Sequence, residues 1–408
     1  MSFKSLGISQ PIVKAISDKG YKTPTEIQVD AIPAILGGKD ILATAQTGTG
    51  KTAAFLLPIL ERLSKSGRAK ANNARVLILV PTRELAAQVG ANTESYSRYL
   101  SLRANVVSGG VKINPQMIKL CKGTDVLVAT PGRLLDLVQK NAIKFTQLQT
   151  LVLDEADRML DMGFAKEINK ILTLLPKQRQ NLMFSATFSN EIKSLADLIV
   201  KNPLEISVNP NETTTITINE ILYPVDEKRK SALLVKLFKM NNWKQVLVFC
   251  MTKKSANSLI RFLEKKNIKA SAIHGDKSQG ARTRALSEFK EGKINILVAT
   301  DLAARGLDIH QLPQVVNYDL PHINEDYTHR IGRTGRAGQS GEAISLVCSN
   351  EFKKLSEIER LIKKLIPRKT IEGFEPKDKL PASILDTRPI KPKKPKKPKK
   401  PKAAQPDK

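Results

Sequence analysis

Cysteine, aromatic residues and long hydrophobic runs are all scarce in this sequence of 408 residues. Its three cysteines, Cys121, Cys250 and Cys348, lie far apart and lack metal-ligand spacing, which argues against a disulfide framework or a cysteine metal site. No apolar run approaches the length of a membrane span, and the first residues contain no signal-peptide core. We therefore expect a cytoplasmic protein that does not insert into a membrane.

Acidic residues are few relative to basic ones. The chain has 67 Lys and Arg against 39 Asp and Glu, which gives a formal net charge of +28. This excess predicts a polyanionic partner, most simply a nucleic acid, although a basic surface with no specific partner would give the same composition. Aromatic residues make up only 5% of the chain and Trp243 is its one tryptophan, so no platform for stacking bases is obvious.

The length and the 41% of hydrophobic residues suit two domains with separate cores. Short apolar runs alternate with longer helical patterns, which predicts parallel sheets covered by helices on both faces. Two of these runs recur at one common offset. Residues 76–82 (VLILVPT) resemble 246–252 (VLVFCMT), and 126–130 (VLVAT) resemble 296–300 (ILVAT). We interpret the repeat as tandem copies of one α/β domain.

Changes in composition predict the domain boundaries. We expect a first domain over residues 1–208, a polar and turn-rich linker over 209–217, a second domain over 218–370 and a tail over 371–408. Residues 391–402 read KPKKPKKPKKPK, and regular prolines with repelling charges predict an extended, disordered tail. We favour an electrostatic RNA tether over a tail that serves only solubility.

A phosphate-binding loop is predicted at residues 45–52 (AQTGTGKT), between an apolar strand and an apolar helical pattern. Gly48 and Gly50 would let backbone N–H groups turn towards phosphates at a helix N-terminus. Lys51 would reach the β- and γ-phosphates, and the Thr52 hydroxyl would bind Mg²⁺. The usual first glycine of this pattern is an alanine here, which weakens the match to the pattern but leaves its context intact.

A short apolar strand at 151–153 ends in adjacent carboxylates. We expect Asp154 to hold Mg²⁺, directly or through water, and Glu155 to orient and deprotonate the attacking water. A solvated turn or a helix N-terminus would also favour carboxylates, but the loop at 45–52 favours a hydrolytic site. Asp157 is expected to bond the segment Ser185-Ala186-Thr187, which follows another apolar run.

These features resemble the motifs of DEAD-box ATP-dependent RNA helicases of helicase superfamily 2. The motifs match in order over roughly residues 3–340: GYKTPTEIQ (20–28), AQTGTGKT (45–52), PTRELAAQ (81–88), GG (109–110), TPGR (130–133), DEAD (154–157), SAT (185–187), VFCMTK (248–253), ATDLAARGLD (299–308) and HRIGRTGRAG (329–338). Residues 274–286 (HGDKSQGARTRAL) and the lysine-rich extension most resemble the bacterial RhlE-type branch. The resemblance implies two tandem RecA-like domains, with ATP and Mg²⁺ as cofactors and RNA as the partner.

The resemblance also implies a nucleotide-binding set. Gln28 would bond the adenine edge, Phe3 would stack on the base, and Asp308 would contact the ribose. The full set is Phe3, Gln28, Ala45, Gln46, Thr47, Gly48, Thr49, Gly50, Lys51, Thr52 and Asp308.

Arginine replaces lysine in one short window of the second half. The segment HRIGRTGR contains Arg330, Arg333 and Arg336 and no lysine, although lysine outnumbers arginine over the whole chain. Such a cluster suggests planar, bidentate phosphate contacts. With the resemblance, Arg333 and Arg336 are expected to be arginine fingers for the γ-phosphate, and His329 to couple to the carboxylate motif. RNA-backbone arginines and an ordinary packed histidine remain the alternatives.

If the phosphate loop and the arginine fingers lie on different domains, ATP binding must close the cleft between the domains. Closure would also complete an RNA path of small polar and basic groups that face phosphates and 2′-hydroxyls without reading sequence. The expected RNA contacts are Arg83, Gly110, Thr130 and Arg133 in the first domain and Thr252, Gly275, Arg282 and Thr300 in the second.

The expected activity is RNA-dependent ATP hydrolysis coupled to local, non-processive unwinding or remodelling of RNA by a monomer. An ATP-gated RNA clamp or annealing chaperone is the first alternative, and a translocating DNA helicase is the second. The ribosome and the RNA-degradation machinery are candidate partners.

Overall fold

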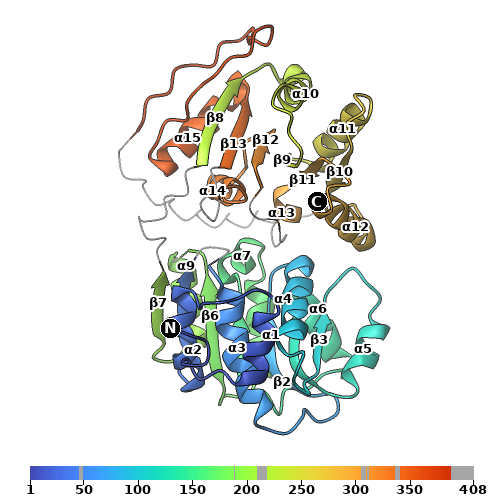
Figure 1. The fold of residues 1–408 in the computed structure, drawn as a ribbon, viewed down its shortest axis with the longest axis vertical. Helices are drawn as coiled ribbons and strands as arrows, with labels where there is room; N and C mark the ends of the chain where they lie inside the picture. The colour runs from blue at the N-terminus through green and yellow to red at the C-terminus, as the bar shows by residue number, and fades with distance from the viewer. Residues whose placement is uncertain are drawn as a thin grey trace, which may run out of the picture.

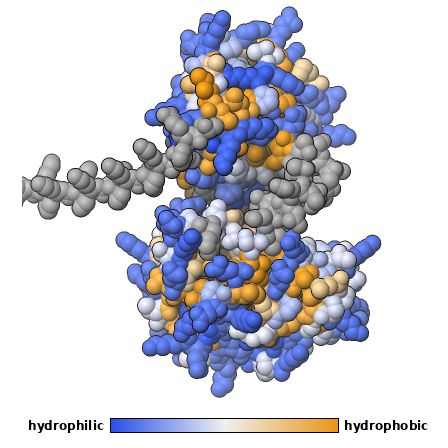
Figure 2. Space-filling model, turned by 90° about the vertical axis from the view of Figure 1, so that its left-hand side faces the viewer, coloured by the Kyte–Doolittle hydropathy of each residue, from blue (hydrophilic) through white to orange (hydrophobic). Residues whose placement is uncertain are grey.

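Two α/β domains follow one another along the chain and lie one above the other in Figure 1. The structure, a computed structural model, describes residues 1–45, 49–187, 189–208, 218–304, 309, 312–335 and 341–386. The predicted linker at 209–217 and the predicted tail beyond 386 lie outside the described residues. Figure 2 shows the two lobes from the side, with a largely hydrophilic surface interrupted by apolar patches.

The first domain is built on a sheet of parallel strands in the order β3-β4-β2-β5-β6-β1-β7. The strands are β1 (Ile41–Ala45), β2 (Ala74–Leu79), β3 (Ala104–Val107), β4 (Thr124–Ala129), β5 (Thr150–Leu153), β6 (Gln180–Ser185) and β7 (Leu204–Val208). The helices are α1 (Gln10–Ser17), α2 (Glu26–Leu36), α3 (Lys51–Ser64), α4 (Arg83–Tyr96), α5 (Asn114–Leu120), α6 (Pro131–Gln139), α7 (Ala156–Asp161), α8 (Ala165–Leu174) and α9 (Asn190–Ile199).

The second domain repeats this plan with parallel strands in the order β10-β11-β9-β12-β13-β8. The strands are β8 (Ile218–Pro224), β9 (Val246–Phe249), β10 (Ala270–Ile273), β11 (Ile296–Ala299), β12 (Gln314–Asn317) and β13 (Gly341–Val347). The helices are η2 (Glu227–Arg229), α10 (Lys230–Met240), α11 (Lys253–Glu264), α12 (Gln279–Lys290), α13 (Asp301–Ala304), α14 (Glu325–Ile331), η3 (Ser349–Glu351) and α15 (Phe352–Ile362).

Both faces of the first sheet are buried, which explains the continuous apolar runs. Along β2, Val76 and Ile78 pack into one hydrophobic cluster, whereas Leu77 and Leu79 pack into the cluster on the opposite face. Alternate side chains of a strand point to opposite faces, so a sheet covered by helices on both sides needs apolar residues at every position. The predicted fold of two RecA-like domains is confirmed.

The internal repeat preserves both strand register and helix capping. Leu77 pairs with Leu127 in the first sheet, and Leu247 pairs with Leu297 at the same place in the second. The threonine that ends each repeated run caps the next helix through its hydroxyl oxygen. Thr82 Oγ1 accepts from Leu85 N at 3.2 Å, and Thr252 Oγ1 accepts from Ser255 N at 3.0 Å. The similarity of these segments therefore reflects one structural unit used twice.

The structure differs from the predicted start of the tail. Residues 366–386, which we call the C-terminal strap, lie against the second domain, on the face carrying β8 and α15 (Figure 1). Ile371 and Phe374 pack on one of its hydrophobic clusters and Leu380 on another. Lys369 N donates to Leu222 O at 2.8 Å, so the strap also binds the edge strand β8. The spacing of Ile371, Phe374 and Leu380 follows neither a helix nor a strand period, so residues 371–386 were expected to belong to the tail.

None of the helices in the described residues combines the length and the apolar character that crossing a bilayer requires.

Candidate functional site

The predicted site residues follow strand ends that meet between the two domains. Glu84 at the start of α4 contacts Arg282 of α12, and Arg158 of α7 lines a small cavity together with residues of α13 and α14. The carboxyl edges of the two sheets therefore face one another (Figure 1). Ligands of open α/β sheets bind beyond this edge, so the candidate site lies between the domains.

The predicted phosphate loop connects β1 to α3. Gly50 adopts φ 95°, a left-handed conformation, and a Cβ there would lie 2.4 Å from Gln28 Nε2, so only glycine fits. Lys51 is the first residue of α3, is buried, and donates from Nζ to Ala45 O at 2.7 Å. Thr52 follows it in the first turn of the helix. Gln46, Thr47 and Gly48 lie outside the described residues.

Gln28 ties α2 to the phosphate loop. Its side chain is 3% exposed; Oε1 accepts from Thr25 N at 3.0 Å, and Nε2 donates to Gly50 O at 3.1 Å. Thr25 Oγ1 donates to Thr49 O at 2.8 Å, so two side chains at the start of α2 hold the loop. Each carboxamide atom keeps capacity for one more bond, and the predicted contact with adenine stays a prediction.

Phe3 lies in the hydrophobic core rather than on an open surface. Its side chain is 4% exposed and packs in the cluster that contains Leu6 and Ile8. The ring is therefore not offered to a base in this structure, which differs from the expected stacking role. Tyr21, seven residues before Gln28, is 41% exposed, with its ring centroid 6.2 Å from that of Tyr96. Sequence reasoning missed Tyr21, although it stands in the same motif as Gln28.

The two adjacent carboxylates follow β5 in contrasting conformations. Asp154 is 3% exposed, and burial raises its pKa to about 7 against the opposing charge of Lys51. Glu155 has φ 55°, a left-handed conformation that is strained for a residue with a side chain. Its buried Oε2 accepts no hydrogen bond from the described residues, although Arg158 Nε lies 3.5 Å away. Strain and an unsatisfied carboxylate oxygen both suit a residue that receives a ligand or a water.

The residues present fit a Mg²⁺ ion held jointly with a nucleotide. No three His, Cys, Asp or Glu side chains of the described residues form a cluster that would bind a metal alone. Mg²⁺ is usually bound by one or two carboxylates together with substrate phosphates and water. Asp154, with the Thr52 hydroxyl at the phosphate loop, supplies that kind of partial ligand set.

Asp157 binds the end of β6. Its Oδ2 accepts from Ala186 N and Thr187 N at 3.0 Å each and from Thr187 Oγ1 at 3.2 Å. Ser185, the last residue of β6, is fully buried beside them. The contact expected from the sequence is present, so a movement of the carboxylate motif would be transmitted directly to the segment 185–187.

The arginine-rich segment lies on and after α14. A small cavity brings Arg158 of the first domain together with Asp301, His329, Arg330 and Arg333 of the second. His329 is thereby near the residue that follows the carboxylate motif, and Arg333 is 5% exposed at the cavity. The finger and coupling roles stay predictions. Arg336 and Asp308 lie outside the described residues.

Arg330 binds inside the second domain, unlike a free phosphate ligand. Its Nε and Nη2 donate to the two oxygens of Asp301 at 2.5 and 2.7 Å, and Nη1 donates to Asn317 Oδ1 at 3.0 Å. The guanidinium also lies 5.0 Å from the centroid of the Phe249 ring. These contacts use the planar fork that the arginine cluster suggested, but the partner is a carboxylate of the same domain.

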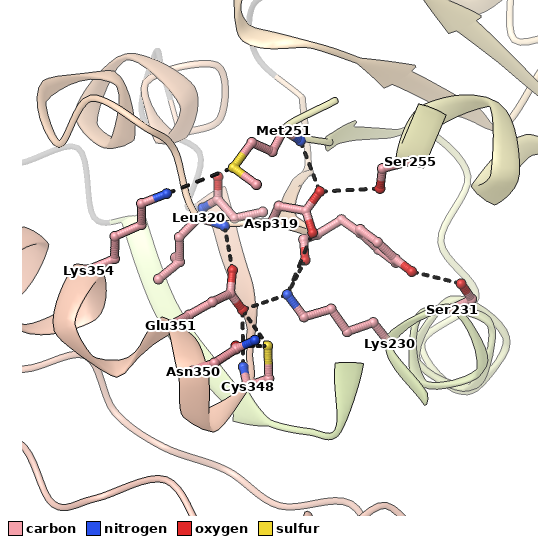
Figure 3. A network of polar contacts seen from close by, with 12 residues as sticks. Lys230, Ser231, Met251, Ser255, Asp319, Leu320, Cys348, Asn350, Glu351 and Lys354 are labelled. Atoms are coloured by element: carbon pink, nitrogen blue, oxygen red, sulfur yellow. Dashed lines mark hydrogen bonds and ion pairs between the residues drawn. The ribbon is translucent and has the colours of Figure 1, made fainter. Parts of the chain in front are cut away.

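A polar network around Asp319 connects Arg330 with the turn that carries Thr252, and Figure 3 shows its contacts with Met251 and Ser255. The carboxylate of Asp319 accepts from Met251 N at 2.9 Å and from Ser255 Oγ at 3.3 Å, and its backbone oxygen accepts from Arg330 Nη1 at 2.6 Å. Buried Lys230 lies 3.7 Å from the same carboxylate. Asp319 therefore joins the turn that carries Thr252 to helix α14. Sequence reasoning did not identify it.

Lys230 is held mainly by Glu351. Its Nζ donates to Glu351 Oε2 at 2.6 Å and to Tyr318 O at 2.9 Å (Figure 3). Burial would lower the pKa of Lys230, but Glu351 and Asp319 outweigh it and raise the pKa above its usual range. The buried ammonium is thus charged and fixes α10, β12 and η3 against one another.

The predicted RNA contacts occupy equivalent positions in the two domains. In each sheet they follow three neighbouring strands, β3-β4-β2 in the first domain and β10-β11-β9 in the second. Residues at these strand ends are Arg83, Gly110, Thr130 and Arg133, and Thr252, Gly275 and Thr300. The structure thus brings them to one region of each carboxyl edge, and their contacts with RNA stay predictions.

Three of these residues shape the surface of the first domain. Gly110 has φ 74°, and a Cβ there would lie 1.6 Å from Arg83 Nη1, so the guanidinium covers the glycine closely. Arg133 Nη2 donates to Val111 O at 3.0 Å, whereas its buried Nε and Nη1 make no hydrogen bond to the described residues, although Asp136 Oδ2 lies 3.5 Å from Nε. Unsatisfied guanidinium donors next to a glycine-rich turn suit an anionic ligand.

Arg282 contacts the first domain. Its Nη2 lies 2.7 Å from Glu84 Oε1, and Gln279 Nε2 donates to the same oxygen at 3.1 Å. The side chains of Arg282 and Glu84 are only 12% and 9% exposed, and burial lowers the pKa of Arg282. The structure therefore places Arg282 in an ion pair between the domains, and its RNA contact stays a prediction. Glu84 was not identified from the sequence.

Comparisons with known proteins agree with this geometry. Residues 25–195 match the DEAD/DEAH box helicase family model, and residues 229–338 match the helicase conserved C-terminal domain. The DEAD-box ATP-dependent RNA helicase RhpA of Helicobacter pylori is 42% identical over 361 residues, covering 88% of this chain and 72% of RhpA. The ATP-dependent RNA helicase SrmB of Escherichia coli is 39% identical over 383 residues, covering 93% and 86%.

Solved structures show the same two-domain arrangement. S. cerevisiae Dbp5 bound to RNA and ADP BeF3 has a TM-score of 0.80 at 32% identity and covers 92% of this chain and 96% of its own. The DEAD-box helicase Mss116 bound to ssRNA and UDP-BeF has a TM-score of 0.81 at 28% identity, covering 91% and 80%.

Proposed function

This chain belongs to the DEAD-box ATP-dependent RNA helicases, and from that premise and the geometry of its cleft we propose how it couples ATP hydrolysis to local RNA remodelling. Nucleotide and RNA sites lie side by side at the facing edges of the two domains. The proposal is that one closure of these domains completes both sites, and that unwinding is local and non-processive. Assignment to the RhlE-type branch stays a prediction.

The division of the site between domains is the observation that carries this proposal. Lys51, Asp154 and Glu155 lie on the first domain, whereas Arg333 and His329 lie on the second and meet Arg158 of the first at a small cavity. A phosphate transferred at the first domain would therefore meet the arginine donors of the second domain when the domains are together. Hydrolysis by either domain alone should be poor.

The site residues of the first domain have separate roles in the hydrolytic step. Lys51 exchanges its bond to Ala45 O for the β- and γ-phosphates, and the backbone around Gly50 receives the phosphates at the start of α3. Thr52 and Asp154 would hold Mg²⁺, which when bound would offset the negative charge that develops on the phosphate oxygens. Glu155 orients the attacking water and takes its proton through the carboxylate oxygen that has no hydrogen bond.

The base and ribose contacts complete the nucleotide site. Gln28 reads the adenine edge with the remaining capacity of its carboxamide, and Asp308 contacts the ribose. Of the two aromatic candidates, Tyr21 has an exposed ring and Phe3 does not, so the burial supports Tyr21 as the stacking residue.

Arg333 and Arg336 stabilise the charge on the γ-phosphate from the second domain. Binding of RNA would affect the position of these two arginines through contacts within the second domain. Thr252 lies next to the turn that Asp319 holds, and Asp319 accepts a hydrogen bond from Arg330 on the helix that precedes Arg333. An RNA strand seated at the strand ends would thus fix the helix that presents the fingers. Bending of that strand on closure separates it from its complement.

The proposal is tested by ATPase assays with and without single-stranded RNA. Glu155→Gln removes the base but keeps the size of the side chain, and we expect turnover to fall about 100-fold or more. Arg336→Ala should lower the RNA-stimulated rate about 1,000-fold. Lys293→Ala, in an exposed ion pair with Glu291, is the control. An ATPase that ignores RNA, or variants with unchanged rates, would contradict the proposal.

The Lys/Pro-rich tail supports a second activity, ATP-gated clamping or strand annealing. Its composition favours salt-dependent binding to any RNA backbone. Deletion of residues 391–408 leaves the strap in place, so loss of annealing with unchanged unwinding per bound complex would identify the tail as the annealing element. Unwinding assays with DNA duplexes of matched sequence test the alternative that the protein is a translocating DNA helicase. We also propose that the protein acts as a cytoplasmic monomer and that its partners include the ribosome or the RNA-degradation machinery.

A further inference from the structure

A groove opens on the outer surface of the second domain, between helices α10 and α11. It has a volume of about 650 Å³ and is lined by Ala232, Val235, Lys236, Lys239, Met240, Phe262 and Lys266. We call it the α10–α11 groove. Val235 and Phe262 join its floor to the hydrophobic core, whereas Met240 on its rim is 51% exposed. An apolar hollow with a polar rim is typical of a surface that binds a partner.

The charge around the groove has one sign. Lys236, Lys239 and Lys266 line it, all three are exposed, and no ion pair of the described residues involves any of them. Among the residues that the structure describes, no carboxylate lines the groove. An occupant with acidic groups beside its apolar side chains would bury the floor and pair with the rim. The protein's own tail is excluded, because residues 391–402 are lysines and prolines and would be repelled.

The groove lies at the end of the domain away from the RNA and nucleotide sites. Helix α10 begins beside Tyr318, at the carboxyl edge of the sheet, and α11 begins directly after the turn that carries Thr252. The groove is formed by the later parts of both helices, from Val235 to Met240 and from Phe262 to Lys266. At 1.5 Å per residue, Met240 lies about 15 Å along α10 from its start. An occupant would therefore leave the cleft open.

We propose that the α10–α11 groove docks an acidic, amphipathic segment of a partner protein, which inserts apolar side chains over Val235 and Phe262 and pairs carboxylates with the lysine rim. A peptide of this kind presents anchors at every third or fourth residue when helical. An RNA strand would satisfy the lysines but would leave the apolar floor uncovered, so the floor favours a peptide. The segment attaches the helicase to a larger assembly without competing with RNA.

The test uses the full-length protein and a defined probe. The probe is a panel of fluorescein-labelled synthetic peptides of about 18 residues, with leucine or phenylalanine at helical spacing and glutamate elsewhere. Scrambled peptides of the same composition are the controls. Fluorescence anisotropy should show a Kd of about 10 to 100 µM for at least one patterned peptide, weakened severalfold by added salt.

Two groove variants and one matched control locate the binding. The double variant Lys236→Glu/Lys239→Glu and the single variant Met240→Asp should each weaken binding at least about tenfold. Lys265→Glu changes an exposed lysine of the same segment that does not line the groove, and should change binding less than about twofold. Circular dichroism melting should be unchanged in all three variants because the altered side chains are exposed, and RNA-stimulated ATPase should be unchanged because none lies in the cleft.

Three results would overturn the proposal. The first is a panel in which no peptide binds more tightly than about 1 mM, or in which scrambled peptides bind equally well. The second is binding that persists in the groove variants. The third is a short oligouridylate that competes with the peptide and loses affinity in the same variants, which would make the groove an RNA surface. RNA-stimulated ATPase of the wild type reports on the helicase activity separately.

Discussion

The ion pair between Glu84 and Arg282 allows a direct test of domain closure. The two side chains come from different domains, lie 2.7 Å apart and are largely buried. From sequence, Arg282 was expected to bind RNA; in the structure it holds the domains together. Glu84→Ala separates these roles, because it breaks the pair and leaves every predicted RNA contact in place.

The expected magnitude follows from the burial of the pair. Exposed ion pairs contribute about 0.2–1 kcal/mol, whereas removal of one partner from a buried pair costs about 3–5 kcal/mol. This pair lies at a boundary that water enters on opening, so we expect about 2 kcal/mol, or about 30-fold in the closure equilibrium. Glu84→Ala should cost more than Arg282→Ala, because Gln279 loses its partner as well.

The measurement is a double-mutant cycle on the RNA concentration that half-activates the ATPase, supported by fluorescence transfer between one dye on each domain. The double variant should be only slightly worse than Glu84→Ala alone. Additive effects would refute the ion pair as a closure contact. If Glu84→Ala has almost no effect on this RNA concentration but Arg282→Ala has a large one, Arg282 would be assigned to the RNA site instead. Lys293→Ala controls for the loss of a surface pair.

Three further predictions follow from the site. Burial raises the pKa of Asp154 to about 7, so the neutral carboxyl favours the folded state, and this contribution to stability is lost as pH rises from the pKa of the unfolded chain towards 7. In thermal unfolding of the nucleotide-free protein, Asp154→Asn should therefore stabilise by up to about 2 kcal/mol more at pH 8 than at pH 5. An equal gain at both pH values would contradict this prediction. Gly110→Ala should displace Arg83 and weaken RNA binding about fivefold to tenfold by anisotropy with unchanged ATP affinity, unlike Gly67→Ala, where a Cβ meets open space. Arg330→Lys should lower the urea stability of the second domain by about 2–4 kcal/mol, whereas lost ATPase with unchanged stability would make Arg330 a phosphate ligand.

The fold could be predicted because its main features are local or repeated. Strands buried on both faces must be apolar at every position, and the matching runs around Leu77 and Leu247 revealed the duplication that the common register confirms. The phosphate loop and the carboxylate motif could be located for a related reason. Their residues act from consecutive positions at one strand end, so spacing alone carries the chemistry.

Contacts between distant segments could not be predicted in the same way. Glu84 and Asp319 have ordinary neighbours in sequence, and their roles arise only when α4 meets α12 or when β9 and β12 lie side by side. The choice between Phe3 and Tyr21 depends on how far each ring is buried, and isolated aromatic residues in a sequence do not reveal this. Arg330 shows the limit of residue type, because a guanidinium fork fits a carboxylate as well as a phosphate.

The strap changes how the chain can be shortened. A chain ending at residue 370, where composition alone places the end of the second domain, would lack Ile371, Phe374 and Leu380 and would uncover the apolar surfaces that they protect. The segment that lies along β8 would also lose its anchors and expose an unpaired strand edge. Such an edge recruits strands from other molecules, so this truncated protein should self-associate on storage. A chain ending at 386 keeps the edge covered and should remain dispersed.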